Sequence, residues 1–272
     1  MKHKIAIISD VHGNVTALQE VVKDVKKECC TEAWYMGDLI MPGSGTDDLL
    51  SLLKEINTTT YVLGNWDSYL FEGDEADRHE DPQYVYFSTL IDYVKQNMDT
   101  EGIDFIKSWP MQVIKHVGPL TISLSHNLPD KNYGHDLRPM NNTENFEELF
   151  AADDSIDIAI VGHTHRQFMR PTTGGQIVLN PGAVGQPFSD RAKLFSDLRS
   201  RYLILEIDET GLADVDFRRV HYDRHAEFEL AKIRKLPYIE LYEKQMDTGV
   251  TYTHDRDVLK GLNDKHGYNS FE

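Results

Sequence analysis

Five short motifs hold residue types that bind transition metals through oxygen or imidazole nitrogen. They contain two aspartates, one asparagine and four histidines: Asp10, His12, Asp38, Asn65, His126, His163 and His165. No thiolate lies among them, so the set suits Mn, Fe or Zn rather than a structural cysteine zinc site. Seven side chains are too many for one tetrahedral ion. They suit two ions that share a bridging carboxylate, the arrangement that clamps the attacking and leaving oxygens in phosphoryl hydrolysis.

Each motif lies at the end of a segment that is typical of a buried strand. The chain reads KIAIIS before Asp10, AWYM before Gly37-Asp38, TYVL before Gly64-Asn65, TISLS before His126 and IDIAIV before Gly162-His163. Ligands of open α/β sheets bind beyond the carboxyl ends of strands, so we expect the motifs to converge there. Two motifs contain side chains two residues apart, which an extended backbone would point to the same side.

Strand-like and helix-like segments alternate along the first third of the chain. Strands are predicted over residues 4–10, 33–38 and 60–65, and helices over residues 13–28, capped by Asn14, and 46–56. This order implies a parallel sheet with right-handed crossovers. An inserted helical segment is predicted over residues 68–110, followed by strands within 111–126, 156–165 and 176–182, a hairpin over 201–220 and a helical tail over 223–272. We therefore predict one α/β domain over residues 1–272, with two sheets and helices outside.

The charge balance limits the partners of this chain. Its 272 residues carry 28 basic and 45 acidic side chains, a net charge of −17. That balance argues against long nucleic acids and membranes as partners, but not against a small phosphorylated substrate such as a nucleotide if metal ions supply positive charge. The adjacent Cys29 and Cys30 are expected to be free thiols. The chain has no signal-peptide pattern and no run long enough to span a membrane, so a cytoplasmic protein is expected.

The order D-x-H, G-D, G-N-x-D, H and G-H-x-H resembles the calcineurin-like metallophosphoesterase superfamily. The stretch LNPGAVGQPFSDR, residues 179–191, is similar to a feature of its small bacterial and archaeal members. The resemblance extends to about Val220 and implies a four-layer α/β/β/α sandwich of two mixed sheets with a dimetal site at the sheet edges. It implies that two Mn or Fe ions, or Zn, are bound, and that a hydroxide bridging them attacks phosphorus.

The resemblance also assigns roles to individual residues. It places Asp10, His12 and His165 on the first ion, Asn65, His126 and His163 on the second, and Asp38 between them. Of these, Asp38, Asn65 and His126 are also the residues that we expect to act directly in catalysis.

Trp66 departs from the pattern of the family. Many relatives have a histidine there, oriented by the next acid, that protonates the leaving oxygen. An indole cannot do this, and general acid catalysis typically contributes about 10²–10⁴-fold. We therefore predict hydrolysis of bonds whose leaving groups depart as stable anions, in nucleotides such as ATP, dinucleoside polyphosphates and aryl phosphodiesters. Trp66 either stacks on the substrate or packs beneath the site, and Asp67 either contacts the substrate or supports the loop.

Further candidates lie outside the motifs. His135 follows His126 in a loop and could contact the substrate or replace the missing acid. Candidate phosphate contacts are Lys131, Arg138, Arg166 and Arg191, for which a solvated surface charge is the competing interpretation. The other histidines are assigned to the surface or the core: His3, His79, His116, His221, His225, His254 and His266.

Three alternatives to this function stay open. One is a protein Ser/Thr-type phosphomonoesterase, which the missing acid disfavours. Another is a non-catalytic metal-binding scaffold of the same fold, which the complete set of seven ligands disfavours. A third is a nuclease, which the net charge of −17 disfavours.

Overall fold

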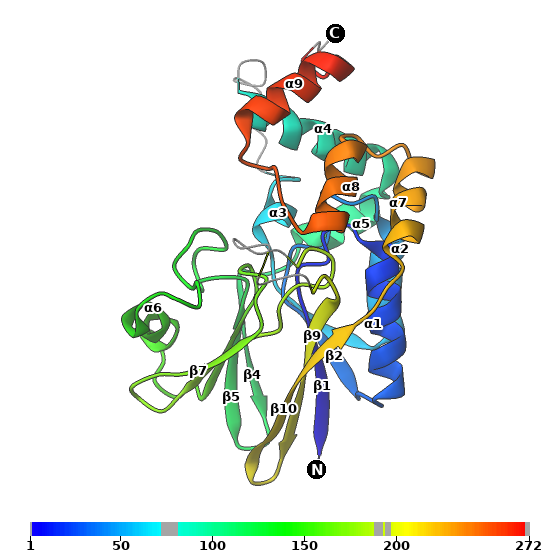
Figure 1. The fold of residues 1–272 in the computed structure, drawn as a ribbon. Helices are drawn as coiled ribbons and strands as arrows, with labels where there is room; N and C mark the ends of the chain where they lie inside the picture. The colour runs from blue at the N-terminus through cyan, green and yellow to red at the C-terminus, as the bar shows by residue number, and fades with distance from the viewer. Residues whose placement is uncertain (1, 72–80, 188–192, 194–196, 270–272) are drawn as a thin grey trace.

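The computed structural model describes residues 2–71, 81–187, 193 and 197–269. Within these ranges, two mixed five-stranded sheets pack face to face, and helices cover their outer faces. Figure 1 shows the layers in order, from α1 and α2 through the two sheets to α6. This is the predicted four-layer α/β/β/α sandwich.

The first sheet has the order β10-β9-β1-β2-β3. Its parallel strands are β1 (His3–Ile8), β2 (Glu32–Tyr35) and β3 (Thr58–Tyr61), and β9 (Ser200–Asp208) and β10 (Gly211–Val220) add an antiparallel hairpin. Strand β1 is buried on both faces because its alternate side chains enter different cores. Ile5 and Ile7 pack between the sheets, whereas Ala6 and Ile8 pack under the helices.

The second sheet has the order β4-β5-β6-β8-β7. Its strands are β4 (Gln112–Val117), β5 (Leu120–Ser125), β6 (Ile158–Val161), β7 (Phe168–Pro171) and β8 (Ile177–Asn180). Helix α6 (Thr143–Glu147) and the 3₁₀ turn η1 (Glu148–Phe150) cover its outer face. Strands β1, β2, β5 and β6 all end toward the same edge of the sandwich, where the polar motifs begin.

The helices of the first layer begin where the sequence predicts. Asn14 caps α1 (Val15–Lys27) by accepting a hydrogen bond from the backbone N–H of Ala17 at 2.9 Å, and α2 (Asp47–Glu55) has two acids in its first turn. The apolar face of α1 packs on the sheet through valines and Leu18. Cys29 and Cys30 follow α1 as free thiols, as expected.

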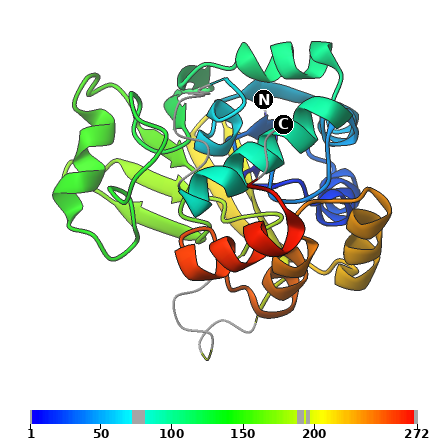
Figure 2. The same ribbon diagram turned by 90° about the horizontal axis from the view of Figure 1, so that it is seen from above.

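The inserted segment and the tail pack against each other. The segment before β4 contains α4 (Pro82–Asn97) and α5 (Thr100–Lys107), and the tail contains α7 (Arg224–Ile233), α8 (Ile239–Thr248) and α9 (Arg256–His266). Arg256 forms an ion pair with Asp81 at 2.7 Å, and Asn263 donates a hydrogen bond to the Pro82 carbonyl at 3.1 Å. Figure 2 shows α4 beside α9 above the sandwich. The two appendages therefore meet through α4 and α9.

Two elements differ from the sequence prediction. Strand β3 ends at Tyr61 rather than Asn65, because the GNWD stretch begins the short helix α3 (Asn65–Ser68). Strand β7 was not predicted, since its four residues FMRP contain a charge and a proline. Among the described residues, every helix is too short or too polar to cross a bilayer.

Glu227 on α7 anchors the tail to the first layer. Its carboxylate is fully buried and accepts hydrogen bonds from the Thr16 backbone N–H at 2.8 Å and from the Tyr242 hydroxyl at 2.9 Å. Burial raises the pKa of this carboxyl above its usual value. We expect Glu227→Ala to lower the free energy of unfolding by about 2 kcal/mol, because both donors lose their acceptor in the interior. Chemical denaturation measures the change.

Glu229 on the same helix is the matched control. It pairs with Lys232 at 2.8 Å on a partly exposed face. Glu229→Ala should change the free energy of unfolding by less than about 0.5 kcal/mol. Equal effects of the two substitutions would contradict the anchoring role of Glu227.

Candidate metal centre

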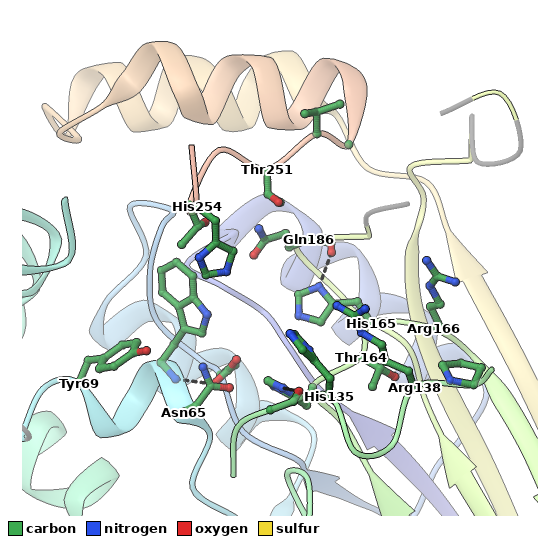
Figure 3. Close-up of a pocket in the computed structure, with 18 of the residues that line it drawn as sticks. Asn65, Tyr69, His135, Arg138, Thr164, His165, Arg166, Gln186, Thr251 and His254 are labelled. Carbon is green, nitrogen blue, oxygen red and sulfur yellow. Dashed lines mark hydrogen bonds between the residues drawn. The ribbon is translucent and has the colours of Figure 1, made fainter. Parts of the chain in front are cut away.

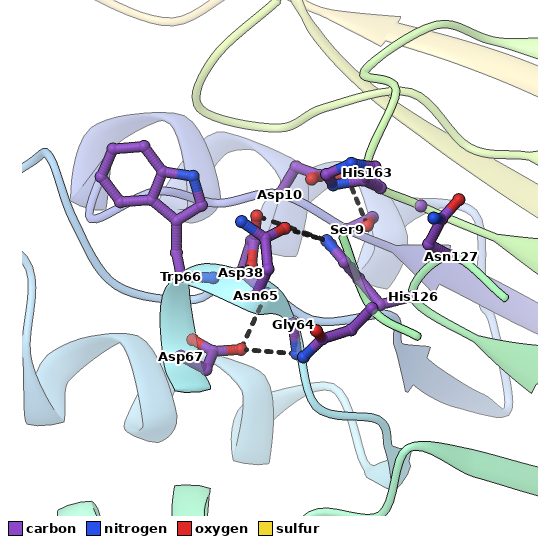
Figure 4. Close-up of polar contacts among 12 residues, drawn as sticks. Ser9, Asp10, Asp38, Gly64, Asn65, Trp66, Asp67, His126, Asn127 and His163 are labelled. Carbon is purple, nitrogen blue, oxygen red and sulfur yellow. Dashed lines mark hydrogen bonds and ion pairs between the residues drawn. The ribbon is translucent and has the colours of Figure 1, made fainter. Parts of the chain in front are cut away.

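The predicted ligand side chains converge at the common edge of the two sheets. Asp10 and His12 follow β1, Asp38 follows β2, Asn65 opens α3, His126 follows β5, and His163 and His165 follow β6. Figure 4 shows Asp10, Asp38, Asn65, His126 and His163 around one centre. Asp10, Asp38 and His126 are almost fully buried. The centre therefore joins loops from both halves of the sandwich.

The backbone at this centre is left-handed rather than extended. The φ angles are +55° at Asp10, +51° at His12, +59° at Asp38, +63° at His163 and +57° at His165. The expectation that residues two apart share a side through an extended backbone is therefore wrong. Non-glycine residues adopt this region rarely, and such conformations cluster at functional sites, where the surrounding structure compensates their cost.

Backbone carbonyls fix the ring orientation of all four histidines. The hydrogen bonds run from His12 Nδ1 to Met41 at 2.7 Å, His126 Nδ1 to Met36 at 2.6 Å, His165 Nδ1 to Gln186 at 2.6 Å and His163 Nε2 to Gly134 at 2.8 Å. Because a carbonyl oxygen only accepts, the ring nitrogen that faces it carries the proton. In the neutral ring, the other nitrogen then presents a lone pair to the centre, as metal-ligating histidines do.

The ligand atoms form two groups that share Asp38. One group is Asp10, His12, Asp38 and His165, and the other is Asp38, His126 and His163. Asp38 Oδ2 lies 3.6 Å from His12 Nε2 and 3.3 Å from His126 Nε2. Asn65 Oδ1 lies 3.2 Å from His126 Nε2, which adds an oxygen to the second group. This division is the one that the resemblance implied.

The chemistry of these atoms fits a pair of cations. His12 Nε2 and His165 Nε2 are 3.2 Å apart, although each is the nitrogen that carries the lone pair. Asp10 Oδ1 lies 3.1 Å from His165 Nε2, is buried and accepts no hydrogen bond from the part of the chain that the structure describes. Lone pairs this close repel one another unless a proton or cation lies among them. The oxygen and imidazole donors suit Mn, Fe or Zn.

Burial and neighbouring charges shift the pKa values of the ligand side chains in different directions. Burial lowers the pKa of His12 and of His163 to about 4, which keeps both imidazoles neutral. Burial would raise the pKa of Asp10, but the surrounding imidazoles, His165 first, lower it well below its usual value. Burial opposes a charge on His126, but the Asp38 carboxylate outweighs it and raises the pKa of this histidine to about 9. The negative charge of Asp38 at this point favours a positive charge beside it in the second group.

Asp67 is buried beneath the loop of Asp38 and supports it. Its side chain is fully buried, and it accepts hydrogen bonds from the backbone N–H groups of Asp38 at 2.8 Å, Leu39 at 2.9 Å and Gly64 at 3.2 Å. Of the two roles expected for Asp67, the structure shows the support of the loop. Burial, reinforced by the Asp38 charge, raises its pKa to about 7. Gly64 is required beside it, because a Cβ there would lie 2.1 Å from Asp38 Oδ1.

A cavity of about 480 Å³ opens over the centre. Figure 3 shows Tyr69 on one side, Arg138 and Arg166 on the other, and Thr251 and His254 above. Of the predicted substrate contacts, Trp66 and His135 also line the cavity, together with the arginines. These side chains lie where a substrate would bind.

Other predicted contacts lie elsewhere, and one lining residue was missed. Lys131 pairs with Asp136 at 2.9 Å and does not line the cavity. Arg191 and His79 fall outside the described residues. His254 was assigned to the surface or core, but it lines the cavity from the tail. Its distance along the sequence from every motif left no signal of this position.

Comparison with known proteins places the chain in a family. The sequence model of the calcineurin-like phosphoesterase superfamily domain matches residues 3–210. The chain therefore belongs to this superfamily, whose members are dimetal-dependent, and membership favours a phosphoester hydrolase.

Individual relatives match over nearly their whole length. An uncharacterized protein of Methanocaldococcus jannaschii is 27% identical over 256 residues, which cover 87% of this chain and 95% of that protein. A crystal structure of a hypothetical protein from Pyrococcus horikoshii covers 91% of this chain and 99% of its own, with a TM-score of 0.73 and 16% identity. A crystal structure of a metallophosphoesterase from Sphaerobacter thermophilus covers 91% of this chain and 100% of its own, with a TM-score of 0.67 and 24% identity. These two structures show the same fold.

Metal loading tests the two-group arrangement. We expect the wild-type chain to bind two Mn²⁺ ions, and each should stabilise the fold by about 2.7 kcal/mol when its concentration is about 100 times Kd. Asp38→Asn should weaken the binding of both ions, because both groups of ligand atoms contain this carboxylate. Mass spectrometry of the bound metal and thermal unfolding measure the two effects.

His116→Ala is the control, because His116 lies on β4 and belongs to neither group. It should leave the metal content at two ions per chain. A wild-type content of one ion, or an Asp38→Asn variant that retains two tightly bound ions, would contradict the arrangement.

Proposed function

We propose that this protein is a dimetal-dependent phosphohydrolase. Its substrates are phosphoanhydrides, and phosphodiesters or phosphomonoesters with good leaving groups: nucleotides such as ATP, dinucleoside polyphosphates and aryl phosphodiesters. The observation that carries the proposal is the position of Asp38, whose carboxylate lies between two groups of ligand atoms at the floor of one cavity. Mn²⁺ and Fe, with Zn²⁺ as a further candidate, are the ions that this donor set favours.

The charge of the cavity supports an anionic substrate. Asp38 is the only acid among the described residues that line it, although the whole chain carries a net charge of −17. Arg138 and Arg166 line the side opposite Tyr69, and His135 and His254 add imidazoles. A cavity lined by more basic than acidic side chains attracts anions locally, even in a protein whose net charge is negative.

The side chains divide the work of such a reaction. Two bound ions would generate a nucleophile from water and neutralise charge on the phosphoryl oxygens. Asp38 would hold both ions in one fixed relation, while the carbonyl-bound histidines keep their lone pairs directed inward. The guanidinium groups of Arg138 and Arg166 would orient the phosphates by charge-assisted hydrogen bonds.

Trp66 favours substrates with stable leaving groups. Its backbone N–H donates to Asp38 Oδ1 at 2.8 Å, and its ring lies edge-on to His12 at 5.2 Å. The indole thus stands at the centre without a group that can transfer a proton. Protein Ser/Thr phosphoesters release an alkoxide and suffer most from this lack. A non-catalytic scaffold would not need the complete ligand set or the cationic cavity.

A leaving-group series tests this proposal. With Mn²⁺, we expect kcat/KM for an aryl phosphate ester to exceed that for an alkyl ester of similar size by about 10²-fold or more. The factor is the rate contribution that a general acid would make to the alkyl ester and that this site lacks. Trp66→His should raise the alkyl rate selectively. The measurement is kcat/KM across esters of graded leaving-group pKa.

Tyr69→His is the control, because Tyr69 lines the same cavity but does not occupy the position of the missing acid. It should leave the dependence on leaving-group pKa as it is in the wild type. Equal wild-type rates on aryl and alkyl esters would overturn the leaving-group argument.

A further inference from the structure

The cavity over the metal centre is larger and more varied than a phosphate alone requires. Its volume of about 480 Å³ falls in the range of sites for small organic ligands, about 300–1,000 Å³. Its two sides differ in chemistry, with aromatic rings on one and arginines on the other. A substrate that fills it therefore has an apolar, flat part as well as phosphates.

The aromatic side is a continuous wall of three rings. The Trp66 and Phe87 centroids lie 5.0 Å apart, and Tyr69 lies 4.6 Å from Phe87 and 6.4 Å from Trp66. All three rings are only partly buried and line the cavity. Trp66 also touches His12, so the wall begins at the metal centre. Partly exposed aromatic faces of this kind favour a planar group stacked against them.

The tail supplies a polar roof over this wall. The segment that joins α8 to α9 lines the cavity through Thr251, Thr253 and His254, and Figure 3 shows Thr251 and His254 above Tyr69, Asn65 and His135. Gln83 Nε2 lies 2.9 Å from His254 Nδ1, which ties the roof to the helix that carries Phe87. The hydroxyl and imidazole groups can hydrogen-bond the edge of a ring whose face is stacked.

We propose that the wall of Trp66, Tyr69 and Phe87, together with the roof of Thr251, Thr253 and His254, binds the nucleobase of a nucleoside polyphosphate whose phosphates reach the metal centre. This inference rests on the proposed hydrolase function and names its substrate class. The subsite combines Phe87 from the inserted segment with a tail that lies beyond residues 3–210, the part that the family shares. The roof therefore lies outside the part of the chain that the family model matches, whereas the three rings of the wall lie within it.

A comparison of two anhydrides separates the contribution of the base to recognition from the chemistry of the cleaved bond. ATP and inorganic tripolyphosphate contain the same P–O–P bond, but only ATP carries a base. We expect kcat/KM for ATP to exceed that for tripolyphosphate by about tenfold or more. This factor corresponds to the lower range of the free energy of base stacking on aromatic side chains. Thr251→Trp, which fills the space under the roof, and Phe87→Leu, which shortens the wall, should each lower this ratio toward one.

A binding measurement does not require turnover. Isothermal titration calorimetry of AMP, whose alkyl leaving group makes it a poor substrate, with Mn²⁺-loaded protein should show about tenfold weaker binding for Thr251→Trp than for the wild type. Thr210→Trp at an exposed hairpin turn and Phe105→Leu on α5 are matched controls, since neither residue lines the cavity. Both should retain the wild-type ratio and the wild-type affinity for AMP.

The possible failures are distinguishable. If neither anhydride nor an aryl phosphodiester is hydrolysed with Mn²⁺, the hydrolase proposal fails, whereas the AMP titration still tests the subsite. If both anhydrides are hydrolysed at a ratio near one in the wild type, the subsite is refuted and the hydrolase proposal stands. The subsite is also refuted if Thr251→Trp and Phe87→Leu leave both the ATP-to-tripolyphosphate ratio and the AMP affinity at their wild-type values.

Discussion

The buried carboxylate of Asp38 imposes the main constraint on this molecule. One oxygen accepts the Trp66 backbone N–H at 2.8 Å, while the other faces His126 at 3.3 Å and His12 at 3.6 Å. A charge buried this deeply is tolerated only where hydrogen bonds and opposite charges compensate it. The two sheets bring their strand ends to this point, and Asp67, itself buried, secures the Asp38 loop. The fold thus holds a shared carboxylate where two cations can reach it.

The layered fold could be predicted because its strands are buried in a regular way. In β1 the alternation of Ile5 and Ile7 with Ala6 and Ile8 serves two cores, so the segment is apolar throughout and easy to identify. Strand β7 could not be identified, because its pairing with β8 compensates for a weak local preference. The start of α3 was missed because the predicted strand continued to Asn65, whereas β3 ends at Tyr61 and Gly64, which is needed beside Asp38, is the N-cap of α3.

The residue types of the site could be predicted, but their geometry could not. Imidazoles and carboxylates at strand ends are visible in the sequence, whereas the left-handed turns at Asp10 and His12 accompany backbone hydrogen bonds to the loop after β2. The carbonyls that orient the histidines belong to the backbone of residues such as Met36 and Gly134, which carry no side-chain signal. His254 reaches the cavity only because the tail folds back over it.

Anomalous diffraction from crystals grown with Mn²⁺ would locate the ions in the site. The arrangement of ligand atoms predicts two anomalous peaks per chain, one among Asp10, His12 and His165 and one among Asn65, His126 and His163, with the Asp38 carboxylate between them. A single peak, or two peaks of which neither contacts Asp38, would contradict a centre built on a shared carboxylate.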